Sequence, residues 1–213
     1  MGFFGPPNIQ RMKKHGNIRG LIKVMQKERD SRVVGQAIQA LGEIGDEQAI
    51  QPLLDEVQAD HYGSSDQAAA ALVSMAGRLS AIDLRSRLVE EWTSMLCPEG
   101  VHYPASSVHY DGDDDEFNRA WAREERHRIN ADRIWDLGAG RRQVAARALG
   151  MLGDERSVEA LVQCLLTHHL SSYDDHTRRF ALQALRKINS PHAIELLQKV
   201  VNGSEELARL MID

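Results

Sequence analysis

Apolar residues recur at helical spacing near the start of the chain. They follow one another at steps of three and four residues, at Val34, Ala37, Ile38, Leu41 and Ile44. This spacing predicts a helix with one buried face. Gly45 and Asp46 come directly after it; glycine favours the left-handed C-cap of a helix, and aspartate favours the N-cap. The pattern therefore predicts a helical hairpin whose turn lies at these two residues.

The hairpin pattern repeats along the chain. Three segments align on one leucine each, namely residues 32–54 on Leu41, residues 142–162 on Leu149 and residues 178–198 on Leu185. The first two share Ala-Leu-Gly-x-x-Gly-Asp-Glu, and a weaker copy places Leu72 in the same position. Leu41 and Leu72 are 31 residues apart, and Leu149 and Leu185 are 36 apart. A repeat of this period is typical of stacked arrays, so we expect an all-α protein, an α-α superhelix of helical hairpins.

The turns of the later repeats support this interpretation. The second clear copy has Gly153 and Asp154 where the first has glycine and aspartate. The third has Asn189, Ser190 and Pro191 instead. Asparagine also adopts the left-handed conformation, serine is a good N-cap, and proline is tolerated at the first helical position. Different residues thus satisfy the same turn at one aligned position.

Gly42 and Gly150 lie at the same position inside the predicted first helices of two repeats. Glycine in a helix interior costs about 1 kcal/mol of stability relative to alanine. We therefore expect a neighbouring helix to approach so closely at these points that a side chain would obstruct it.

The shared pattern Ala-Leu-Gly-x-x-Gly-Asp resembles the short HEAT-like repeats of the type named after phycobilisome lyases. The resemblance covers residues 17–59 and 141–202 well, and residues 64–95 loosely. It implies a right-handed α-solenoid whose second helices line a concave surface that binds another macromolecule. It implies no particular chemistry.

One segment breaks the period. Leu72 and Leu149 are 77 residues apart, whereas two periods of about 32 residues would need about 64. We therefore expect one solenoid domain over residues 1–213, divided into N-terminal repeats at 17–96, an irregular loop-helix insertion at 97–140 and C-terminal repeats at 141–213. Two interpretations of the insertion stay open, a binding element on one face of the solenoid and a degenerate repeat with a solvated loop.

The insertion contains the candidate partner contacts. Residues 97–136 carry 10 acidic and 5 basic side chains and two of the three tryptophans of the chain. Aromatic side chains are frequent anchors of protein interfaces. The residues that we expect to contact a partner are Trp121, Trp135, His102, His109 and Tyr110.

Composition agrees with a helical protein of the cytoplasm. The chain has 23 Ala and 22 Leu but only 3 Thr, and aromatics make up 5%, whereas strands favour threonine and aromatics. No apolar run reaches the roughly 18 residues of a membrane helix, so we expect no membrane contact. Cys97 and Cys164 form neither a disulfide framework nor a zinc cluster. The net charge of −5 argues against nucleic acid as the partner.

No motif predicts catalysis or a cofactor. The acidic run at residues 111–116 lacks the ligand spacing of a calcium loop. None of the nine histidines has another three or four residues away, the spacing that a helical zinc motif needs. Arginines between Trp121 and Trp135 suit a nucleic-acid surface, but acidic residues stand among them at the spacing of a self-paired helix.

We therefore expect a non-enzymatic scaffold or adaptor that binds a protein partner and holds no cofactor. One alternative is an enzyme built on HEAT-like repeats, either bilin-lyase-like or DNA-glycosylase-like. The other is a purely structural subunit of an obligate complex.

Overall fold

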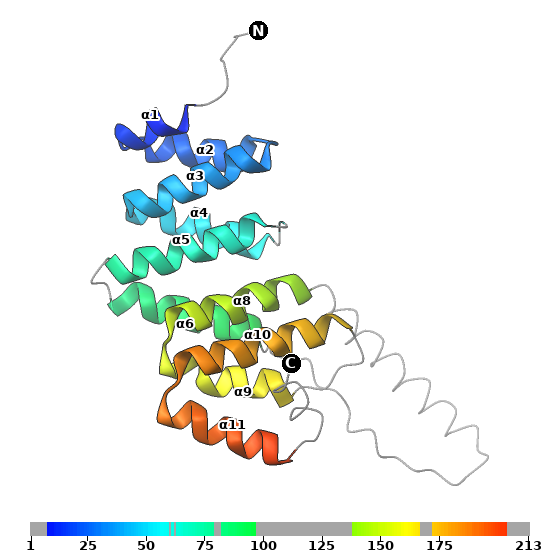
Figure 1. Cartoon of the computed structure of the whole chain (residues 1–213). Coiled ribbons are helices and arrows are strands. Elements are labelled where there is room, and N and C mark those ends of the chain that lie inside the picture. The colour runs from blue at the N-terminus through cyan, green and yellow to red at the C-terminus, as the bar shows by residue number, and fades with distance from the viewer. Residues whose placement is uncertain are drawn as a thin grey trace, which may run out of the picture.

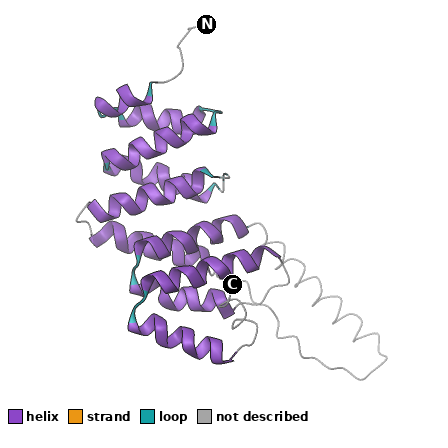
Figure 2. Cartoon of the chain, viewed as in Figure 1, coloured by secondary structure: helices purple, strands orange, loops and turns teal. Residues whose placement is uncertain are grey.

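The computed structural model describes residues 8–59, 61, 63–78, 82–96, 138–166 and 172–203. These residues form helices joined by short turns, and no strand occurs among them (Figure 2). In chain order the helices are α1 (Ile9–Lys14), α2 (Ile18–Lys27), α3 (Ser31–Ile44), α4 (Ile50–Gln58), α5 (Ser64–Arg78), α6 (Ile82–Leu96), α8 (Ala139–Leu152), α9 (Val158–Leu166), α10 (Ser172–Ile188) and α11 (Pro191–Gly203). The expected all-α solenoid is confirmed.

The helices stack in chain order, with α1 and α2 at one end and α11 at the other (Figure 1). We call α3, α5, α8 and α10 the first helices of the repeats, and α2, α4, α6, α9 and α11 the second helices. From α5 onward, each first helix packs against the first helix and the second helix of the repeat before it. Because α8 packs directly against α5 and α6, no further repeat separates α6 from α8 in the described stack.

The four aligned leucines lie at the centre of this stack. Leu41, Leu72, Leu149 and Leu185 occupy successive first helices, and each side chain is 0% exposed. They belong to one hydrophobic core that runs from Ile9 to Leu197. A repeat protein of this kind is stabilised by contacts between neighbouring layers, so the leucines connect the layers.

The turns follow from the capping residues. Gly45 and Gly153 end α3 and α8 in the left-handed conformation, with φ of 74° and 62°. Asp46 then accepts a hydrogen bond from the backbone N–H of Gln48 at 2.8 Å. This bond caps a short 3-10 helix, η1 (Glu47–Ala49), before α4 begins. The aspartate therefore caps a 3-10 turn that leads into the second helix, and not the second α-helix itself.

The other first-helix turn uses different residues, as the sequence predicts. Asn189 has a positive φ of 50°. Ser190 Oγ accepts a hydrogen bond from the backbone N–H of Ala193 at 3.1 Å, and Pro191 is the first residue of α11. The same chain reversal therefore forms with asparagine in place of glycine.

Gly42 of α3 and Gly150 of α8 lie at the predicted close approaches between helices. A Cβ at Gly42 would lie 2.7 Å from Cβ of Ala71, on α5. A Cβ at Gly150 would lie 2.8 Å from both Cα and Cβ of Ala184, on α10. Real Cβ atoms do not approach other atoms so closely. Glycine at these positions therefore sets the spacing between neighbouring first helices.

Candidate functional site

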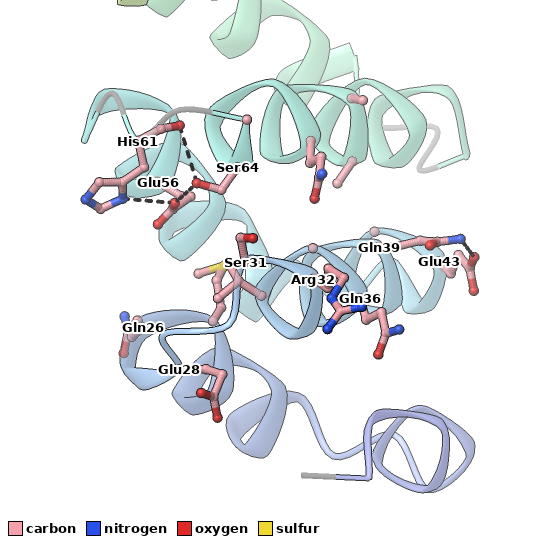
Figure 3. A pocket seen from close by; sticks show the side chains of 18 of the residues that line it. Gln26, Glu28, Ser31, Arg32, Gln36, Gln39, Glu43, Glu56, His61 and Ser64 are labelled. Atoms are coloured by element: carbon pink, nitrogen blue, oxygen red, sulfur yellow. Dashed lines mark hydrogen bonds and ion pairs between the residues drawn. The ribbon is translucent and has the colours of Figure 1, made fainter. Parts of the chain in front are cut away.

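A polar groove lies between the first helices α3 and α5. It has a volume of about 1210 Å³ and is bordered by the end of α2 and by the turn between α4 and α5 (Figure 3). Gly35 on α3 leaves space that the side chain of Gln67 fills from α5, with Oε1 2.4 Å from the position of a Cβ at residue 35. Ala70 and Ala71 keep the α5 side of the groove shallow. Small residues thus create the space, and longer polar ones line it.

Seven residues of this lining carry amide or hydroxyl side chains. They are Gln26, Gln36, Gln39, Gln67, Ser31, Ser64 and Ser74. Two of them are engaged, since Gln39 donates to Glu43 at 2.8 Å and Ser64 donates to Glu56 at 2.6 Å. The side chains of the other five form no hydrogen bond with another residue of the described part. They are therefore available to a ligand.

Charged groups of both signs border the groove. Glu43 pairs with Lys13 of α1 and accepts from Gln39; the hydrogen bond from Lys13 is the main cause that lowers the pKa of Glu43 below its usual value. Arg78 of α5 donates to the backbone carbonyl of Glu43 at 2.8 Å and also to that of Gly42. Arg78 thus satisfies carbonyls at the end of α3 that lack a partner within the helix.

One side of the groove contains Ser64, Glu56 and His61. These are the residue types of a hydrolase site, so their arrangement must be compared with one. Ser64 Oγ donates to Glu56 Oε1 at 2.6 Å, and His61 Nδ1 lies 3.0 Å from the same oxygen (Figure 3). A nucleophilic serine needs its hydroxyl directed at a base that can take the proton, usually histidine. Here hydroxyl and imidazole meet the same carboxylate and not each other. The three residues fasten the turn between α4 and α5.

Polar side chains on the second helices are arranged differently, because they pair with one another across successive repeats. Arg87 of α6 donates to Gln51 of α4, and Gln58 of α4 donates to Glu91 of α6. His192 of α11 lies 2.8 Å from Glu159 of α9, and this hydrogen bond lowers the pKa of Glu159. Several polar groups of the second helices therefore bind each other, whereas most of the amides in the α3/α5 groove have no partner in the described part of the chain.

The groove was not found by sequence reasoning, which turned to the segment that breaks the period. The resemblance to known repeats implied a binding surface on the second helices, whereas this groove is lined mainly by the first helices α3 and α5. Its glutamines lie on exposed positions of the predicted helices. Exposed glutamines are common on helices, so only their convergence in space distinguishes them.

The candidate partner contacts named from the sequence lie outside the described residues. These are Trp121, Trp135, His102, His109 and Tyr110. The third tryptophan, Trp92 of α6, is fully buried and is part of the core. Cys164 on α9 is buried.

Two features of the described residues bear on cofactors and membranes. No three side chains of His, Cys, Asp or Glu among them gather closely enough to hold a metal ion. None of the helices that the structure describes has the length and apolar character needed to cross a bilayer.

Comparison with known families agrees with the repeat architecture. Residues 141–211 match the family model of HEAT repeats, and residues 33–58 match that of the PBS lyase HEAT-like repeat. No curated protein matches the chain. HEAT repeats commonly mediate protein interactions and often form scaffolds or adaptors. With these matches and its stack of helical hairpins, the chain is a HEAT-like repeat protein.

Proposed function

We propose that this protein is a scaffold that binds an extended segment of a protein partner in the α3/α5 groove, without catalysis of its own. The observation that carries the proposal is the set of amide and hydroxyl side chains that line the groove without a partner in the described part of the chain. The proposal is supported further by the protein interactions that HEAT repeats commonly mediate.

The chemistry of the lining suits a peptide backbone. A glutamine side chain offers one carbonyl acceptor and two N–H donors, and an extended peptide presents N–H and C=O groups in alternation. Gln36 of α3 and Gln67 of α5 approach the groove from opposite sides, so a peptide between them would meet a donor and an acceptor on each side. Backbone hydrogen bonds of this kind supply affinity when an extended peptide docks.

The charges of the groove favour a peptide over a nucleic acid. Arg29 and Arg32 are opposed by Glu28, Glu43 and Glu56 on the same lining. A nucleic-acid groove needs an excess of cations along the phosphate backbone. Carboxylates at these positions would repel phosphates.

Three parts of the proposal rest on the sequence alone. We propose one domain over residues 1–213, in which the insertion at 97–140 adds contacts to the partner through its tryptophans, histidines and tyrosine. We also propose that the protein works in the cytoplasm, a reducing compartment, because its two cysteines, Cys97 and Cys164, are too few for a disulfide framework.

Site-specific photocrosslinking in source cells would test the groove. A photoreactive phenylalanine analogue is placed at Gln36 or Gln67, and at Gln51 on the second helix α4 as a matched control. We expect the two groove positions to crosslink the same peptide segment of one protein, and the control position not to. The peptide, once synthesised, should bind the purified chain, and the double variant Gln36→Ala/Gln67→Ala should weaken that binding about tenfold. Equal crosslinking from Gln51, or crosslinks to nucleic acid, would contradict the proposal.

A further inference from the structure

A second hollow lies on the same face, where α5, α8 and α10 meet. It has a volume of about 590 Å³. Its floor consists of small residues, Ala70, Gly150 and Ala184. Because Gly150 and Ala184 hold α8 and α10 in direct contact, no side chain from either helix fills the space above them. The result is a shallow hollow with an apolar floor.

One wall of this hollow is held rigid by an arginine. Arg147 of α8 donates to both carboxylate oxygens of Asp66 on α5, at 2.6–2.9 Å. Its guanidinium lies 4.3 Å from the ring centroid of Phe180 on α10. Asp66 and Phe180 therefore fix the arginine from two sides, and its charge is already balanced by the aspartate. The wall offers a preorganised planar surface instead of a free cation.

An exposed methionine stands at the edge of the hollow. Met151 of α8 lines it and is 37% exposed. The other large hydrophobic residues with such exposure in the described part are Leu166 and Ile194, both on second helices. Methionine adapts its shape to an incoming apolar group. This side chain can therefore contact an aliphatic group that enters the hollow.

Two of the three helices around the hollow are basic, although the whole chain has a net charge of −5. Helix α8 carries three arginines and no acidic residue, and α10 carries four basic residues against two aspartates in its first turn. Arg141, Arg179 and Lys187 are exposed. Among the described residues, Asp66 is the only acidic one that lines the hollow, and it is bound to Arg147. A ligand with negative charge is thus favoured at the rim.

We infer that the α5/α8/α10 hollow binds an acidic segment of a protein that inserts one aliphatic side chain. The aliphatic group lies on the alanine and glycine floor against Met151, and a carboxylate of the segment pairs with Lys187, which lines the hollow. Ala70 borders both this hollow and the α3/α5 groove, but the inference holds whether or not the groove binds a peptide. A phosphate backbone fits less well, because the floor of the hollow is apolar and has a place for an aliphatic side chain.

Peptide selection on the full-length protein tests this inference. A displayed library of short random peptides is selected on the immobilised chain, and enriched peptides are measured by fluorescence anisotropy. We expect enriched peptides to combine acidic residues with Leu, Ile or Met. Met151→Gln and Lys187→Glu should each weaken their binding about tenfold. Matched controls are Ile194→Gln, another exposed hydrophobic residue, and Lys23→Glu, an exposed lysine of α2; both should leave binding unchanged.

Several outcomes would overturn the inference. Enriched peptides that are neutral or basic would exclude the acidic ligand. Acidic peptides that bind Met151→Gln and Lys187→Glu as well as the unchanged chain would place their site elsewhere. A single-stranded oligonucleotide that binds more tightly than the peptides, and is lost in Lys187→Glu, would make the surface a nucleic-acid site. The double variant Gln36→Ala/Gln67→Ala should keep the acidic peptide, so failure of the groove proposal and failure of this one can be told apart.

Discussion

Between α3 and α5, and again between α8 and α10, the first helices touch through a glycine and an alanine, whereas the contact between α5 and α8 lacks this pair. The glycines follow the aligned leucines directly, and α5 has Val73 at that position. The α5/α8 contact is also less extensive than the other two. The two kinds of junction therefore differ in the residue after the aligned leucine, which is glycine in the close junctions and valine in the α5/α8 junction.

The junction without glycine is held by ion pairs. Arg147 of α8 binds Asp66 of α5 on the side of the first helices. On the other side, Arg85 of α6 donates to Asp154 at 2.9 Å and to the carbonyl of Leu152 at 2.6 Å. Close packing depends little on salt or pH, whereas charge pairs depend on both. The α5/α8 junction should therefore respond more strongly to salt and pH than the two glycine junctions do.

Alanine substitution at the two glycines of the close junctions should have the largest effect on stability. In Gly150→Ala the new Cβ would meet the backbone of α10 at Ala184, and in Gly42→Ala it would meet Ala71. Overpacking costs about 1–3 kcal/mol, more than the gain of about 1 kcal/mol in helix propensity. We expect both variants to be destabilised in urea denaturation.

Gly77→Ala is the matched control for these variants. Gly77 lies in the first helix α5, and a Cβ there would meet no atom within 4 Å. The same substitution should therefore stabilise the protein, by about 0.5–1 kcal/mol. If Gly150→Ala and Gly77→Ala change stability in the same direction, close approach is not the reason for the glycine.

Removal of the charge at Asp154 should have the next largest effect, and that effect should depend on pH. Asp154 is 11% exposed and binds Arg85, Arg156 and the backbone N–H of Arg156. The hydrogen bond from the Arg156 side chain is the main cause that holds the pKa of Asp154 well below its usual range. We expect Asp154→Asn to cost about 1.5–3 kcal/mol at neutral pH, typical of hydrogen bonds to a charged group.

The sign of the pH dependence follows from the lowered pKa. The stabilisation by Asp154 is complete above the pKa of about 3.9 that aspartate has in an unfolded chain, and it is lost as pH falls toward the lower folded value. Stability of the wild type and of Asp154→Asn should therefore converge in acid. Asp46→Asn is the control. Asp46 occupies the equivalent turn and binds the N–H of Gln48. Asparagine caps about as well as aspartate, so this substitution should change stability little. A cost that stays constant down to acid pH would show that the charge is not involved.

The contrast between junctions also shows what the sequence could predict. The repeat of Leu41, Leu149 and Leu185 is a local pattern, since burial of one helix face requires apolar residues at fixed spacing. The close approaches at Gly42 and Gly150 could be predicted for a similar reason. Glycine destabilises a helix interior, so its presence there indicates a neighbour that leaves no space for a side chain. Both kinds of inference depend only on residues close together in the sequence.

The candidate sites depend on residues far apart in the sequence. Asp66 and Arg147 are 81 residues apart and meet only because α8 packs next to α5. The sequence period alone left open whether a degenerate repeat lies between them. Gln36 and Gln67 likewise converge only once α3 and α5 are in contact. Exposed glutamines and charged residues obey no spacing rule that would identify their partners.

The pair of Asp66 and Arg147 should have the smallest effect and tests the α5/α8 junction directly. A double-mutant cycle with Asp66→Asn and Arg147→Gln should give a coupling energy of about 0.5–1 kcal/mol, typical of partly exposed ion pairs with good geometry. The coupling should decrease in high salt, because salt screens exposed charges. A second cycle with Phe180→Leu and Arg147→Gln should give about 0.5–1 kcal/mol for the contact between cation and ring, and it should respond less to salt since the ring has no net charge. Thermal or urea denaturation at low and high salt measures both couplings. A coupling near zero between Asp66 and Arg147 would mean that α5 and α8 are held by apolar packing alone, as the glycine junctions are.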